Sequence, residues 1–96
     1  MATLFMKFEW DPAKAASNQR RHRVAFIEAA TVFADTLSVT IYDPDHSKTE
    51  ERCIIIGRST AGRLLMVAHT DRGGQIRIIS ARELTKSERE AYEEGK

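Results

Sequence analysis

The sequence predicts an α+β fold in which one face of an antiparallel sheet packs against helices. Two observations carry this prediction. Apolar residues recur at helical spacing in an early segment, and four segments of strand-like composition, separated by short turns, follow it. Short turns are typical of an antiparallel meander, because parallel neighbours need a long crossover. The expected order is a strand, two helices, a four-strand meander and a last helix, in one domain over residues 1–96.

The first strand is expected over Leu4–Trp10, and the helix after it begins at Asp11-Pro12. Asp accepts hydrogen bonds from the first unpaired amides of a helix, and Pro fits the first helical position. This helix is expected to end near His22. One of its faces carries polar residues spaced by four, which are Lys14, Asn18 and His22.

A second helix is expected over Phe26–Phe33, where apolar residues recur at the i, i+3, i+4, i+7 positions of a core-facing stripe. Ala25 stands where a capping Ser or Asp would be expected. Glu28, three residues later, is therefore half of a capping box whose other half is missing.

Four strands and a helix are expected to follow. Leu37, Val39 and Ile41 alternate with polar residues, which predicts a half-buried first strand. Gly73-Gly74 supplies positive φ in the turn before the last strand. Thr85 and Glu88 form a capping box that opens a peripheral helix ending near Glu94. The expected strands are Thr36–Tyr42, Arg52–Arg58, Arg63–Thr70 and Gln75–Arg82.

The last strand combines β-branched residues with two arginines. If it is regular, Ile76, Ile78, Ser80 and Arg82 share one face, and Arg77, Ile79 and Ala81 share the other. An arginine among isoleucines is costly to bury without a partner. Arg77 is therefore either paired with a carboxylate or directed at an anion.

The composition excludes several classes of protein. A net charge of +1 gives no global basic field, so any polyanion site must be a local cluster. The single cysteine, Cys53, excludes an intramolecular disulfide and is expected to be a small buried hydrophobe. No segment has the length of a membrane span or a signal peptide, so a cytoplasmic location is expected. Met6 is a second possible start, which would make residues 1–5 an extension without a role.

Several short pieces, in this order along the chain, resemble the BrnT family of type II toxins. The resemblance covers Met6 to Tyr92. It implies a RelE-like α+β fold, an endoribonuclease activity that blocks translation, and a partner antitoxin, BrnA. Contact with DNA is implied only indirectly, through the antitoxin, which lets the complex repress its own operon. The pieces are Phe8-Glu9-Trp10-Asp11-Pro12, Lys14, Asn18, Arg21-His22, Phe26, Glu51-Arg52, Gly57, and Arg77-Ile78-Ile79-Ser80-Ala81-Arg82.

Three positions depart from the family pattern. Arg23 stands where the family generally has Gly, in a turn that needs a left-handed residue, and Ala25 stands where a capping residue is usual. These two departures bear on stability. His69 stands where an aromatic residue, often Tyr, is common, which leaves open whether this chain is fully active.

RNA cleavage without a metal ion needs a base, an acid and cations that stabilise charge on the phosphate. Arginine suits the cationic role because its planar guanidinium binds phosphate through two hydrogen bonds. Each arginine has the alternative of pairing with a carboxylate such as Glu51, Asp71 or Glu83. No cofactor and no metal site are expected, since the three histidines lack metal-ligand spacing. The catalytic candidates are His22, Glu51, Arg52, Arg77 and Arg82.

The proton carriers have structural alternatives as well. His22 is a candidate base or acid because an imidazole can accept or donate a proton, yet a histidine at a helix end also binds the last carbonyls. Glu51 is either a general base or a group that holds Arg52 or Arg77 in place. His46 is expected to be a solvated loop residue. His69 either lies at the edge of the site or packs on the sheet.

A local basic cluster is formed by Lys14, Arg20, Arg21 and Arg23. It is either a solvated helix face or a surface that binds RNA or an acidic segment of the antitoxin. Tyr92 either stacks on a base or anchors the last helix. A non-catalytic module that binds RNA or protein, acting as antitoxin partner and co-repressor, is the alternative function. The RNA-binding candidates are Lys14, Arg20, Arg21, Ser80 and Tyr92.

Overall fold

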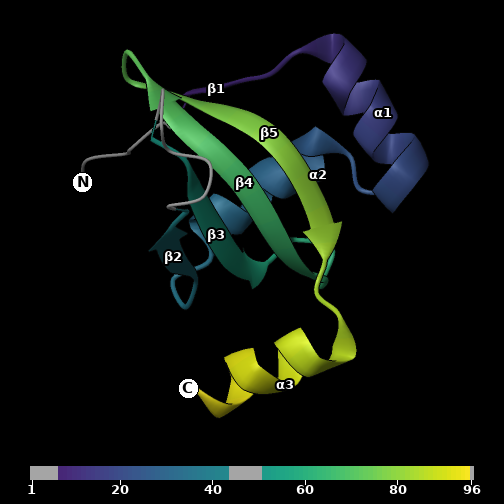
Figure 1. Ribbon diagram of the computed structural model, residues 1–96, viewed down its shortest axis with the longest axis vertical. Helices are drawn as coiled ribbons and strands as arrows, with labels where there is room; N and C mark the ends of the chain where they lie inside the picture. Colours follow the sequence, from purple (N-terminus) through teal and green to yellow (C-terminus); the bar gives the residue numbers. More distant parts are fainter. Residues whose placement is uncertain (1–6, 44–50, 96) are drawn as a thin grey trace.

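The computed structural model describes residues 7–43 and 51–95, and Figure 1 shows their arrangement. Five strands in these residues form one sheet, in the order β1-β5-β4-β3-β2. Strands β1 and β5 are parallel, and all other neighbours are antiparallel. The strands are β1 (Lys7–Glu9), β2 (Val39–Tyr42), β3 (Cys53–Arg58), β4 (Leu64–Arg72) and β5 (Gln75–Glu83).

The helices begin where the sequence predicts. The Asp11 carboxylate accepts a hydrogen bond of 2.8 Å from the backbone N–H of Ala13, and Thr85 and Glu88 form a complete capping box. The second helix is shorter than expected, because its last turn over Val32–Ala34 is a 3-10 helix, η1. The α-helices are α1 (Pro12–His22), α2 (Phe26–Thr31) and α3 (Lys86–Glu94). The α+β class and the order of elements are confirmed.

The link between α1 and α2 has the two unfavourable features that the sequence predicts. Arg23 ends α1 in the left-handed region, with φ 57° and ψ 36°, and its N–H donates to the carbonyl of Gln19. Ala25 precedes α2 and provides no side-chain cap. Glu28 accepts hydrogen bonds from Arg63 and Ser59 instead.

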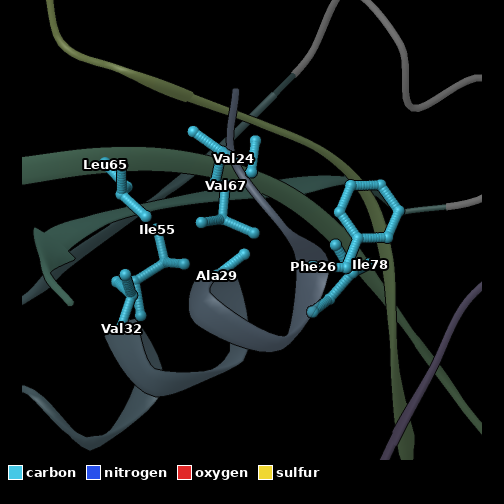
Figure 2. Close-up of a cluster of buried hydrophobic side chains, with 9 residues drawn as sticks. Val24, Phe26, Ala29, Val32, Ile55, Leu65, Val67 and Ile78 are labelled. Carbon is cyan, nitrogen blue, oxygen red and sulfur yellow. The ribbon is translucent and has the colours of Figure 1, made fainter. Parts of the chain in front are cut away.

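The hydrophobic core lies between the sheet and the two helices α1 and α2 (Figure 1), and Figure 2 shows its central side chains. Phe8, in β1, makes an edge-to-face contact with Phe33. Trp10, just after β1, makes a similar contact with Phe26. The cluster therefore ties the first strand to α2 and η1. Its buried members are Val24, Phe26, Ala29, Val32, Ile55, Leu65, Val67, Ile78 and Ala81.

The half-buried strand predicted over Thr36–Tyr42 was wrong in two respects. The strand begins only at Val39, and all four of its residues are exposed because β2 is an edge strand. Leu37, expected on the apolar face of this strand, lies in the turn before it and is 66% exposed. Cys53, expected to be buried, is only partly so.

A β-bulge in β5 makes the predicted face assignment wrong beyond Ile78. Ser80 pairs with Ala68 and Ile78 pairs with His69, so Ile79 is an extra residue. Ile78 and Ala81 consequently both face the helices, and each is 1% exposed. Ser80 and Arg82 move to the opposite side, here called the open face, which they share with Arg77.

The turn between β4 and β5 has the backbone conformation that the sequence predicts. Gly73 and Gly74 both have positive φ, of 57° and 85°, as the predicted turn requires. The part of the first strand before Lys7, the possible extension over residues 1–5, and His46 lie outside the described residues. None of the helices in the described part of the chain has the length and apolar character to span a bilayer.

Candidate functional site: a pocket on the open face of the sheet

The open face carries a pocket of about 340 Å³ between the sheet and the last residue of α1. Strands β3, β4 and β5 supply its floor, and the α1 helix supplies one wall. The lining combines cations, an imidazole, a carboxylate and a hydroxyl with an apolar base. The lining residues are His22, Asp43, Arg52, Ile54, Met66, Ala68, Ile79, Ser80, Ala81 and Arg82.

Asn18 fixes the position of α1 beside β5. Strand β1 pairs with β5 only up to Arg77, so the outer edge of the later part of β5 has no neighbouring strand in the described residues. The side-chain amide of Asn18 donates 2.8 Å to the carbonyl of Ala81 and accepts 3.0 Å from its N–H. It also donates to the carbonyl of Val24. This buried side chain substitutes for a strand and attaches the helix to the sheet.

The attachment through Asn18 determines where His22 lies. The two residues are four apart and therefore on the same face of α1. His22 consequently reaches the edge of β5 at the level of Ile79 to Arg82 and lines the pocket, half-buried. Lys14, Arg20 and Arg21 are exposed on the same helix and do not line the pocket.

Arg82 is bound tightly by Glu88, in the first turn of α3. Nη1 donates 2.8 Å to one carboxylate oxygen, and Nη2 donates 2.9 Å to the other. These hydrogen bonds from Arg82, together with one from the N–H of Thr85, lower the pKa of Glu88 to about 2. They also raise the pKa of Arg82. Both groups are therefore charged over the whole physiological range of pH.

Arg52 and Asp43 line the same pocket as Arg82; Asp43 directly follows β2, and Arg52 directly precedes β3. The N–H of Asp43 donates 2.9 Å to the carbonyl of Arg52, which continues the pairing of β2 with β3. Asp43 was not among the candidate residues predicted from the sequence, although it lines the pocket. Its signal was the alternation of β2, because Val39, Ile41 and Asp43 fall on one face.

Three further predicted residues, Glu51, Arg77 and Tyr92, also lie outside the pocket. Arg77 donates 2.9 Å to Glu9, its cross-strand neighbour on β1, so it has the carboxylate partner that was one of its two alternatives. Glu51 is exposed, and its carbonyl accepts from the Thr70 hydroxyl. Tyr92 donates 2.9 Å to the carbonyl of Leu37 and so anchors α3.

His69 faces the helices and not the pocket. Its ring packs edge-to-face on Phe33, with centroids 4.8 Å apart, and its Nε2 is buried without a hydrogen-bond partner in the described residues. Burial lowers the pKa of His69 below its usual 6.5. Among residues 7–43 and 51–95, no three His, Cys, Asp or Glu side chains group closely enough to hold a metal ion.

Comparisons with known proteins agree with the fold. The family model described as "Ribonuclease toxin, BrnT, of type II toxin-antitoxin system" matches residues 10–88. The crystal structure of the Brucella abortus ribonuclease toxin BrnT is similar, with a TM-score of 0.63 and 21% sequence identity, over 85% of this chain and 100% of that one. The comparison with curated protein sequences gave no match. Because the family model covers most of the sequence, the chain belongs to the BrnT family of ribonuclease toxins of type II toxin–antitoxin systems.

Proposed function

We propose that the chain is a metal-independent endoribonuclease that cleaves RNA in the pocket on the open face and thereby inhibits translation in the cytoplasm. The observation that carries the proposal is the convergence of His22, Arg52, Ser80 and Arg82 on one cavity. These residues come from α1, from the position just before β3, and from β5. The pocket therefore brings together a proton carrier, two cations and a hydroxyl.

The proposed reaction is attack of a ribose 2′-oxygen on the adjacent phosphorus, with loss of the 5′-oxygen of the next nucleotide. A base takes the 2′-hydroxyl proton, and an acid returns a proton to the leaving oxygen. His22 suits either step because an imidazole can accept or donate a proton. Asp43 is the carboxylate that lines the pocket, so we assign the other proton transfer to Asp43 in place of Glu51.

Arg52 and Arg82 are proposed to hold the non-bridging phosphate oxygens. Guanidinium groups stay charged and bond phosphate through two parallel hydrogen bonds, which stabilises the charge that develops in the transition state. Ser80, between them on β5, supplies a further donor. Arg77 has a structural role in this proposal, since its pair with Glu9 joins β1 to β5. Lys14, Arg20 and Arg21 supply a positive approach surface along α1.

Membership in a type II system implies an RNA substrate and a cognate antitoxin. We propose that the antitoxin is BrnA-like and neutralises the toxin by covering the pocket and the basic surface of α1. The same charges then serve RNA and antitoxin, so the two cannot bind together. Contact with DNA is expected only through the antitoxin.

The test is cleavage of a single-stranded RNA by purified protein in the presence of EDTA. His22→Ala is expected to reduce the rate by about 10²–10⁴-fold, and Arg52→Ala by about 10²–10³-fold. The matched control is Arg89→Ala, which removes an exposed arginine outside the pocket and should leave the rate unchanged. Circular dichroism verifies that each variant is folded.

Three results would count against the nuclease proposal. These are loss of cleavage in EDTA, cleavage by His22→Ala at the wild-type rate, and binding of RNA without cleavage. The last result would favour the alternative function, a binding module that acts with an antitoxin as co-repressor. Inhibition of a cell-free translation reaction by the wild type, and its relief by the antitoxin, test the remaining parts.

A further inference from the structure

Glu88 binds one edge of the Arg82 guanidinium and does not bind the other edge. A guanidinium has five N–H donors. One N–H of Nη1 and one of Nη2 form its end edge, and Nε–H with the second N–H of Nη2 forms its side edge. Glu88 occupies the end edge through both carboxylate oxygens. The second N–H of Nη1 donates 3.1 Å to the carbonyl of Glu83.

Arg82 lines the pocket, and the side edge of its guanidinium is weakly engaged. The second N–H of Nη2 lies 3.3 Å from the sulfur of Met66, which is a weak acceptor and lines the pocket. The Nε–H of Arg82 has no hydrogen-bond partner in the part of the chain that the structure describes. This edge presents two parallel donors, which is the geometry that binds two oxygens of one phosphate.

Glu88 connects this arginine to the start of α3. Its Oε1 accepts 2.9 Å from the N–H of Thr85, which closes the capping box, and also accepts from Nη1 of Arg82. Its Oε2 accepts from Nη2 of Arg82. The capping box therefore orients the carboxylate independently of its contact with the guanidinium. The long side chain of Arg82, which has many rotamers when unbound, is thus held in one orientation by the start of α3.

We infer that Glu88 is a positioning residue, which holds Arg82 so that its Nε–Nη2 edge faces the pocket and receives an RNA phosphate. This inference rests on the proposed function, because it concerns the same pocket. It assigns α3, which lies beyond the end of the sheet (Figure 1), a role in RNA binding without contact to RNA. The opposite possibility is that Glu88 competes with phosphate for Arg82.

The test is the affinity for a fully 2′-O-methylated RNA oligonucleotide, which cannot be cleaved, measured by fluorescence anisotropy. Glu88→Gln keeps the capping box, since Gln serves there as well as Glu. It offers the guanidinium only one acceptor oxygen. We expect binding to weaken by about 2- to 12-fold, the loss that follows when one long side chain must be ordered on binding.

Charge alone predicts the opposite sign. Glu88→Gln removes a negative charge, and by electrostatics it should strengthen RNA binding. The matched control is Glu90→Gln, an exposed carboxylate on the same helix, which should bind as tightly as the wild type or slightly tighter. In the Arg82→Ala background, Glu88→Gln should have no further effect, because the group it positions is gone.

The outcomes separate this inference from the proposed function. If Arg82→Ala weakens binding while Glu88→Gln binds as tightly as the wild type or tighter, positioning by Glu88 is refuted and the pocket stands. A loss that persists in the Arg82→Ala background also refutes it, because Glu88 would then act elsewhere. If the wild type does not bind RNA, or if Arg82→Ala binds equally well, the proposed function itself is overturned.

Discussion

Replacing Arg23 by Gly and Ala25 by Ser should stabilise the protein, because the link between α1 and α2 carries two removable costs. Arg23 is the one non-Gly residue with positive φ in the described part of the chain. A left-handed conformation costs an L-residue about 1–2 kcal/mol. Part of this gain is offset, since glycine loses about 0.5–1 kcal/mol more conformational entropy on folding. The net gain from Arg23→Gly is therefore about 0.5–1 kcal/mol.

The second substitution supplies the missing cap of α2. Ala25 has the extended backbone of a capping residue, with φ −78° and ψ 143°, so Ser fits without a change of conformation. A Ser cap is worth about 1 kcal/mol relative to Ala. The two gains together are about 1.5–2 kcal/mol, which raises the Tm of a domain of this size by about 6–16 °C. The hydrogen bond from the Arg63 side chain to the carbonyl of residue 23 is unaffected, because residue 23 contributes only its backbone to it.

Thermal unfolding followed by circular dichroism measures this gain. Arg23→Ala is the control for the first substitution, since it removes the same charge but keeps the Cβ that strains the turn, and it should not stabilise. Ala25→Val is the control for the second, because it adds volume without an acceptor. A double variant that melts at or below the wild-type temperature, or an Arg23→Ala variant that gains as much as Arg23→Gly, would refute the reasoning.

Three further predictions concern stability. Burial lowers the pKa of His69 below its usual 6.5, so the unfolded chain binds the proton more tightly; stability is then full above pH 6.5 and falls as the pH drops below it. Denaturant titrations between pH 7.5 and 5 should show a shallower loss for His69→Phe than for the wild type, and parallel losses would contradict this. Gly57→Ala should cost about 1–3 kcal/mol, because a Cβ there would lie 2.9 Å from both the Asp35 carboxylate and the Ser38 Cβ; an unchanged urea midpoint would be the contrary result. Asn18→Ala leaves the backbone groups that Asn18 binds without partners and should lower the free energy of unfolding by about 3 kcal/mol. A urea midpoint equal to that of the wild type would contradict this prediction.

Local signals predicted the elements well and their surroundings less well. Asp11-Pro12, the Thr85–Glu88 capping box and Gly73-Gly74 each act through residues within a few positions, so their outcome could be predicted from the sequence. The exposure of β2 could not, because alternation of polar and apolar residues does not show whether a strand lies at the edge of a sheet.

The candidate site depended on two features without a local signal. The bulge at Ile79 exchanges the faces of β5 and moves Ser80 and Arg82 away from Ile78. No residue type in that segment specifies a bulge. The partner of Arg77 is Glu9, which is 68 positions away, and only the parallel pairing of β1 with β5 brings the two together. The sequence therefore predicted four of the residues that line the pocket, His22, Arg52, Ser80 and Arg82, and did not predict the residues that surround them.

The parallel contact between β1 and β5 has a consequence for the order in which the molecule is assembled during synthesis. Strand β1 and helix α1 leave the ribosome early, but their hydrogen-bonding partners on β5 are made more than sixty residues later. Until then Asn18 has no backbone to bind and His22 has no opposing wall. A nascent chain is consequently unable to complete the pocket before residues 75–83 emerge.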